Sequence, residues 1–129
     1  MLSVLDTSVL ISSGNTRIEG DLGISAVSIA ELEFGVLVTQ DPEKRALRLA
    51  RLSAILRNFD PLPVDSYVAA SYGRLAALTQ EAGRKTRTRS MDLLIAATAH
   101  AHGARLITAN VSDFDHLLGV LEVVEFADV

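Results

Sequence analysis

The sequence predicts an α/β fold, a three-layer α/β/α sandwich built around a short, mostly parallel sheet. Short apolar stretches at residues 2–5, 104–109 and 121–126 are typical of buried strands. Longer stretches with apolar residues at helical spacing lie between them, and this alternation favours parallel strands joined by helices. At 129 residues the chain has the usual size of one domain, which we expect to cover 1–129.

The helices are predicted from their apolar spacing and from the residues that start and stop them. Asp41 followed by Pro42 indicates a helix start, because Asp can cap the helix and Pro fits its first turn. Gly83 is a typical helix stop. The expected helices run from Asp6 to about Ser12, Ala26 to Val38, Asp41 to about Asn58, Asp65 to Gly83, Asp92 to His102 and Ser112 to Leu118, and a short strand is expected at 23–25.

Composition limits the classes of protein that the chain can represent. Hydrophobic residues make up 49% and charged residues 22%, a balance that indicates a globular rather than a disordered protein. The absence of cysteine excludes a disulfide scaffold, a thiol nucleophile and a cysteine-ligated zinc site. No apolar run reaches the roughly 20 residues that span a bilayer, and no signal peptide is recognisable, so we expect a soluble, cytoplasmic protein. The net charge of −4 disfavours nucleic acid as a partner, unless the acids are concentrated at a metal site.

Four acidic residues stand where a metal-dependent nuclease would need them. Asp6 and Asp113 each follow a predicted strand, and sites in parallel sheets form at the carboxyl ends of strands. Glu31 lies in one predicted helix and Asp92 opens another. If the fold brings these side chains together, their charges repel strongly, and only a bound cation or protons would make the cluster tolerable.

Two of these acids also have structural explanations. Asp6 stands at the start of a predicted helix, where Asp is a common N-cap. Glu31 lies three residues after Ser28, which is the spacing of a capping box. Ser25 is an equally good cap, however, and it would place Glu31 inside the helix rather than at its end.

The other two acids are harder to explain without a site. Asp92 would suit the dipole at a helix start, but Ser90 is available as the cap. The residues after Asp92 are so apolar that we expect the helix start to be nearly buried, where a carboxylate needs a cation or several hydrogen bonds. With Ser112 as a cap and Asp115 as its capping-box partner, Asp113 has no capping role, which favours it as a ligand.

Other chemistries fit the chain less well. A haloacid-type phosphatase needs a second Asp two residues after the first, where Ser8 stands. A receiver domain needs a Lys at a strand end, but the only lysines are Lys44 and Lys85, and neither is placed there. Three histidines are too few and too clustered for a histidine metal site, and His116 is expected on a helix surface.

Four short motifs occur in order along nearly the whole chain. They are Asp6-Thr7-Ser8 after an apolar strand, Ser28-Ile29-Ala30-Glu31-Leu32 followed by Gly35, Asp92-Leu93-Leu94-Ile95-Ala96-Ala97-Thr98-Ala99, and Thr108-Ala109-Asn110-Val111-Ser112-Asp113-Phe114. Together they closely resemble the PIN-domain ribonucleases, especially the VapC-type toxins of bacterial toxin–antitoxin pairs. The stretch from Asp6 to Glu31 is shorter than is usual in that family, and the difference falls in residues 12–23.

The resemblance implies a PIN-like fold and a metal-dependent endoribonuclease, the toxin of a type II toxin–antitoxin system. Its catalytic acids would be Asp6, Glu31, Asp92 and Asp113. Asp6, Asp92 and Asp113 would bind Mg²⁺ or Mn²⁺, which prefer oxygen ligands, and Glu31 would orient or deprotonate the attacking water. The supporting polar side chains would be Thr7, Ser8, Thr108, Asn110 and Asp115.

The resemblance also implies an RNA substrate, a small antitoxin partner and a homodimer. A basic run just before Asp92 could hold the RNA backbone, or it could be an ordinary solvated loop. Its residues are Arg84, Lys85, Arg87 and Arg89. The apolar residues of helices 26–38 and 41–58 could form a partner surface or belong to the core. The alternative function is a catalytically dormant PIN-like scaffold that binds RNA or protein, which should bind no metal at the acids.

Overall fold

The computed structural model describes residues 1–12 and 18–126, and its strands form one sheet. The sheet order is β2-β1-β3-β4, and every neighbouring pair runs parallel. The strands are β1 (Leu2–Leu5), β2 (Asp21–Ile24), β3 (Arg105–Thr108) and β4 (Val123–Glu125). Leu5 is level with Ile24 on one side and with Ile107 on the other, so three strands end at the same edge of the sheet.

The helices agree closely with the expected ranges. They are α1 (Thr7–Ile11), α2 (Ala26–Val38), α3 (Pro42–Asn58), α4 (Ser66–Glu81) and α5 (Ser90–Ala101), with short 3₁₀ helices η1 (Arg87–Arg89) and η2 (Val111–Leu117). The expected last helix is therefore a 3₁₀ helix. The sequence also predicts a polar, basic loop from Gly83 to Ser90, and part of that stretch is the 3₁₀ helix η1. No helix among the described residues has the length and apolar character needed to cross a membrane.

Alternate residues of the strands enter two separate cores, as expected for a sheet covered on both faces. Val4 and Leu106 pack in the larger core with the buried residues of α4 and α5. Leu5 and Ile107 pack in the smaller core with α1 and the end of α3. The small side chains of α5, such as Ala96, are fully buried in the larger core. The predicted α/β/α sandwich is confirmed, with a sheet that is wholly parallel in the described residues.

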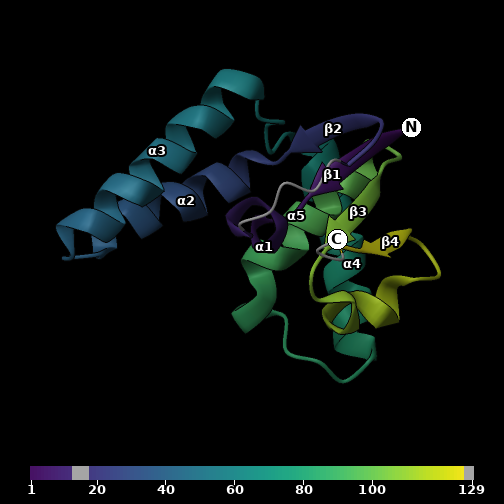
Figure 1. The fold of residues 1–129 in the computed structure, drawn as a ribbon. Helices are drawn as coiled ribbons and strands as arrows, with labels where there is room; N and C mark the ends of the chain where they lie inside the picture. Colours follow the sequence, from purple (N-terminus) through teal and green to yellow (C-terminus); the bar gives the residue numbers. More distant parts are fainter. Residues whose placement is uncertain (13–17, 127–129) are drawn as a thin grey trace.

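Helices α2 and α3 lie side by side and project from the sheet as an arm (Figure 1). The backbone of the arm is fastened to the sheet where it leaves and where it returns. Ser25, which caps α2, forms a parallel bridge with Leu62, which follows α3. The N–H of Leu62 donates to Ile24 O at 2.8 Å, and the N–H of Ala26 donates to Leu62 O at 2.9 Å.

The short segment between Asp6 and Glu31 lies partly outside the described residues. Ser12 is the C-cap of α1, and β2 begins at Asp21. The sequence predicts a loop at residues 13–15, and these residues lie outside those described.

Candidate active site

Asp6 lies at the carboxyl end of β1, where the chain turns directly into α1. Its side chain is buried, with 7% of the residue exposed. The N–H of Asp6 donates to Ile107 O of β3 at 3.1 Å, and its Oδ1 accepts from the N–H of Val9 at 3.3 Å. Asp6 is therefore the N-cap of α1, as the structural explanation proposed. Its Oδ2 accepts no hydrogen bond from the described residues, so capping leaves one oxygen available for a site.

Ser8 joins the ends of β1 and β3. Its hydroxyl donates to Asp6 Oδ1 and accepts from the N–H of Ala109 at 3.1 Å. Thr108 is fully buried, and its Oγ1 accepts from the N–H of Asn110 at 3.0 Å, which shapes the turn after β3. Ser8 and Thr108 thus organise the strand ends, whereas Asn110 is exposed beside them.

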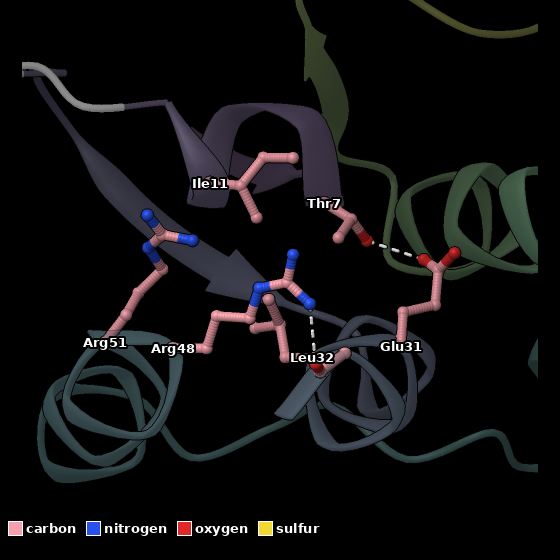
Figure 2. A pocket seen from close by; sticks show the side chains of 7 residues that line it. Thr7, Ile11, Glu31, Leu32, Arg48 and Arg51 are labelled. Carbon is pink, nitrogen blue, oxygen red and sulfur yellow. Dashed lines mark hydrogen bonds between the residues drawn. The ribbon is translucent and has the colours of Figure 1, made fainter. Parts of the chain in front are cut away.

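Helix α2 presents Glu31 to α1 (Figure 2). Ser25 caps α2 by accepting from the N–H of Val27 at 3.1 Å, so Glu31 lies inside the helix and the capping-box alternative is wrong. Thr7 donates to Glu31 Oε1 at 2.6 Å, and the hydroxyls of Thr7 and Ser28 lie 3.0 Å apart. Thr7 has one hydroxyl proton and a carboxylate can only accept, so Ser28 is left to donate to Thr7.

Ser28 contacts the candidate site through Thr7 but is not among the site residues that the sequence predicts. The sequence indicates Ser28 only as a possible cap, whereas in the structure it is fully buried and supports the Thr7 hydroxyl that holds Glu31. Its position three residues before Glu31 was the available sign, because residues at that spacing share one face of a helix. Oε2 of Glu31 has no hydrogen-bond partner among the described residues, so it is available to accept from a water.

Asp92 lies in the first turn of α5, which begins at Ser90. Arg89 occupies the cap position, and no side chain caps the helix. Asp92 is exposed, so the expectation of a nearly buried helix start is wrong. The apolar residues that follow, such as Leu93 and Ile95, are buried on the side of α5 that faces the core.

The environment of Asp92 raises the pKa of its carboxyl group. Partial burial of the carboxyl is the largest cause, and the negative charges of Glu31, Asp6 and Asp113 raise the pKa further, while Arg89 lowers it. Because Asp92 as a whole is exposed, the repulsion is the more informative cause: it requires the other three acids to lie within electrostatic reach. Asp6, Glu31 and Asp113 come from separate elements and lie within electrostatic reach of Asp92, and we call these four acids the acidic cluster.

Asp113 is carried by η2, and Arg89 fixes its position. Arg89 Nη1 donates to Asp113 O at 3.2 Å and lies 3.4 Å from Asp113 Oδ1. The expected capping box is wrong, because η2 has no side-chain cap. Asp115 instead forms an ion pair with Arg84, which also donates to the backbone of Ser112 and Asp113.

His116 is not on the surface, contrary to the expectation for a helix residue. Only 7% of its side chain is exposed, and its Nε2 lies 2.8 Å from Thr79 Oγ1. Burial lowers the pKa of the His116 imidazole, and the charge of Arg84 lowers it further. His116 is therefore a neutral residue packed against α4 rather than a ligand.

The profile of the PIN domain family matches residues 3–117, a range that contains all four acids. The chain belongs to the PIN domain family. This PIN domain is 36% identical to ribonuclease VapC4 of Mycobacterium tuberculosis over 112 residues, which cover 82% of the chain and 84% of the relative. It is 36% identical to ribonuclease VapC5 of the same organism over 126 residues, covering 93% and 90%. The expected VapC-type resemblance is confirmed.

Solved structures of similar fold agree with this assignment. The structure of VapBC-5 from Mycobacterium tuberculosis, described as a member of the VapBC family of toxin–antitoxin systems, has a TM-score of 0.85 and 35% identity, covering 97% of this chain and 98% of that chain. FitAcB from Neisseria gonorrhoeae has a TM-score of 0.75 and 28% identity, covering 95% and 96%. The PIN-like fold is therefore confirmed as well.

The acidic cluster of this PIN domain suits a hard divalent cation, since carboxylate oxygens are the ligands such ions prefer. Within residues 1–12 and 18–126, no three acidic or histidine side chains form a group arranged to hold a metal ion. Mg²⁺ commonly keeps several waters and takes only one or two protein carboxylates. A hydrated Mg²⁺ ion therefore does not require a group of three carboxylates. The repulsion that raises the pKa of Asp92 is the sign that a cation would stabilise the cluster.

A pocket of about 410 Å³ opens beside the acidic cluster, between α1, α2 and α3 (Figure 2). Its lining residues are Thr7, Ile11, Glu31, Leu32, Gly35, Arg48 and Arg51. The two arginines were not among the predicted site residues. Arg48 and Arg51 are three residues apart on α3, on the side where Leu52 and Ile55 are buried. That spacing was the available sign that their side chains face inward.

Proposed function

We propose that this PIN domain is a metal-dependent endoribonuclease that acts in the cytoplasm as the toxin of a type II toxin–antitoxin pair. The observation that carries the proposal is that Asp6 lies at the carboxyl end of β1 beside Thr7, which donates to Glu31 Oε1 at 2.6 Å. The charges of Glu31, Asp6 and Asp113, which raise the pKa of Asp92, support the proposal further. The names of the VapC ribonucleases support RNA as the substrate. The similarity to VapBC-5, a member of the VapBC family of toxin–antitoxin systems, supports a small antitoxin as the partner.

In the proposed mechanism, Asp6 and Asp92 would be the most direct ligands of Mg²⁺ or Mn²⁺, and Asp113 would complete the site through water. The bound ion would supply positive charge to a phosphate oxygen and to the leaving oxygen, and would acidify water. Glu31 orients or deprotonates the attacking water through Oε2, because Thr7 holds Oε1. Ser8 links the carboxylate of Asp6, after β1, to the N–H of Ala109, after β3, and so keeps Asp6 next to the segment that leads to Asp113.

Exposed apolar side chains on the arm support protein partners. Phe34, Leu37 and Leu47 are 67%, 74% and 69% exposed, so much of the apolar character of α2 and α3 lies outside the core. An antitoxin and a second copy of the chain are the partners that we propose for this surface.

The decisive experiment compares Asp92→Asn with the wild-type protein in RNA cleavage with Mg²⁺ or Mn²⁺. Asn keeps the shape of the side chain and removes its charge, so cleavage should fall by about 100-fold or more while the circular dichroism spectrum stays unchanged. Glu31→Gln should also lose cleavage. Glu33→Gln is the matched control, because Glu33 is exposed on the same helix two residues away.

Calorimetry with Mn²⁺ separates the enzyme from the dormant scaffold. The wild-type protein should bind Mn²⁺, and Asp92→Asn should bind it more weakly. A folded wild-type protein that neither binds Mn²⁺ nor cleaves RNA would support the scaffold and contradict the proposal. For the toxin role, expression of the wild type should arrest growth and produce discrete RNA ends, whereas Asp92→Asn should do neither.

A further inference from the structure

The geometry points to a phosphate-binding subsite for single-stranded RNA in the pocket beside the acidic cluster, with Arg48 and Arg51 as its binding residues. The inference deepens the proposed function and rests on it. RNA that approaches the acidic cluster meets four carboxylates in a chain of net charge −4, so its phosphates are repelled there unless positive charge lies nearby. The question is which basic residues supply that charge.

The basic run that the sequence singled out is only partly available for this task. Arg84 is paired with Asp115, and Arg89 lies against Asp113, so both are engaged with η2. Lys85 and Arg87 are exposed, and no ion pair or hydrogen bond fixes either within the described residues. Two exposed charges that no hydrogen bond or ion pair holds define no position for a phosphate group.

The pocket offers positive charge in a defined position. Arg48 Nη1 donates to the backbone O of Gly35 at 2.7 Å, which directs its guanidinium into the space between α2 and α1 (Figure 2). A guanidinium has five N–H donors, so this bond leaves the others for a ligand. Arg51 also lines the pocket, and among the described residues no carboxylate pairs with either arginine. Two adjacent guanidinium groups match phosphate oxygens well.

The rest of the pocket fits a nucleotide that continues from the reacting phosphate. Glu31 and Thr7 form one end, so an RNA chain that passes the acidic cluster can enter directly. Ile11 and Leu32 supply apolar surface for a sugar or base. The volume of about 410 Å³ lies in the usual range of small-ligand sites, roughly 300–1,000 Å³.

Gly35 lines the pocket and contributes no side chain to it. A Cβ added at Gly35 would meet no atom within 4 Å, so the space beside it is unfilled. A larger side chain at this helical position should therefore enter the pocket without displacing the backbone. Gly35→Leu is accordingly a second way to block the subsite, and it leaves both arginines in place.

The test measures the affinity of a short fluorescein-labelled single-stranded RNA by fluorescence anisotropy in EDTA, where no metal-dependent cleavage occurs. Arg51→Ala should raise Kd about tenfold and lower the slope of log Kd against log salt by about 0.7, the value expected for one lost phosphate contact. Arg48→Ala and Gly35→Leu should also weaken binding, and Arg51→Lys should recover part of it. Arg57→Ala, which removes an exposed charge at the far end of α3, is the matched control and should stay within about twofold of wild type.

The inference is overturned if Arg51→Ala and Arg57→Ala have the same Kd and salt slope. It is also overturned if Arg51→Ala weakens binding of an acidic oligoglutamate peptide but not of RNA, because the pocket would then serve a protein segment. Since binding is measured without turnover, the result is independent of the cleavage assay. If Arg51→Ala binds RNA as the wild type does while cleavage still depends on Asp92, the subsite is refuted and the nuclease is not. If Arg51→Ala weakens RNA binding while the wild type shows no Asp92-dependent cleavage, the nuclease is refuted and the subsite is not.

Discussion

Two groups of arginines flank the acidic cluster, and they differ in what their guanidinium groups contact. Arg84 and Arg89, close together in sequence, bind the backbone and the carboxylates of η2. Arg48 and Arg51 lie on a helix far away in sequence and point into an open pocket. The comparison teaches that a dense run of charge in a sequence can be engaged within the fold, while the charge available to a substrate comes from another element.

The largest expected effect tests whether Arg89 positions Asp113 for catalysis. Arg89→Ala removes the groups that hold the backbone and carboxylate of Asp113, so kcat for RNA cleavage should fall about 10–100-fold with little change in KM. Arg51→Ala should do the opposite and raise KM with kcat nearly unchanged. Steady-state kinetics on a fluorogenic RNA measures both. The comparison breaks down if the two variants change the same parameter.

A second expected effect concerns pH and the buried side chain of His116. Because burial lowers the pKa of His116, the unfolded chain binds its proton more readily than the folded one. The stability of the fold should therefore be complete above the ordinary pKa of histidine, near 6.5, and should decrease as the pH falls below it.

His116→Gln should flatten this dependence in urea unfolding measured between pH 5 and pH 8. One histidine can contribute at most about 1.4 kcal/mol per pH unit to the slope. Gln can still hydrogen-bond to Thr79, so the variant keeps the packing contact in neutral form. An unchanged slope in His116→Gln would mean that other groups cause the pH dependence.

A smaller effect separates the engaged arginine from its exposed neighbour. Arg84→Ala should lower the free energy of unfolding by about 0.5–1 kcal/mol, a modest value because the side chains of the Arg84–Asp115 pair are 29% and 52% exposed. Arg87→Ala is the control, and it should change stability by less than about 0.5 kcal/mol. Urea denaturation gives both values. Equal losses of unfolding free energy in Arg84→Ala and Arg87→Ala would show that the contacts of Arg84 with η2 do not stabilise the fold.

The smallest effect concerns the arm. Gly35→Ala should stabilise the protein by about 0.5–1 kcal/mol, because Gly in a helix interior costs conformational entropy and the added Cβ meets no atom within 4 Å. Thermal unfolding measures the gain. A loss of stability would mean that the helix backbone at Gly35 departs from the conformation described, and with it the acceptor that directs Arg48.

Local rules predicted much of the fold. The bounds of α2 and α3 agree with the expectation because their caps are encoded in a few adjacent residues, Ser25 for one and Asp41 with Pro42 for the other. The same rules failed at η2. A capping box there was locally reasonable, but the long-range ion pair with Arg84 took Asp115 instead.

The acids of the site were predictable because each lies in a recognisable motif, whereas their surroundings were not. The exposure of Asp92 depends on which side of α5 meets the sheet, and an apolar run of small residues does not specify that side. The pocket requires α3 to pack beside α1 and α2, so no stretch of sequence contains it. Arg48 and Arg51 therefore became visible only in three dimensions.

The fastening of the arm by Ser25 and Leu62 has an evolutionary consequence. Because both ends of the arm meet at one bridge beside β2, matched insertions or deletions at its tip, around residues 39–41, would change its reach without moving the strand ends. The arm can therefore diversify in length and tip sequence while the catalytic end stays under separate constraint. Proteins that descend from one ancestral gene could in this way acquire arms that bind different antitoxins. Each protein in a cell would then bind its own antitoxin and not that of a relative.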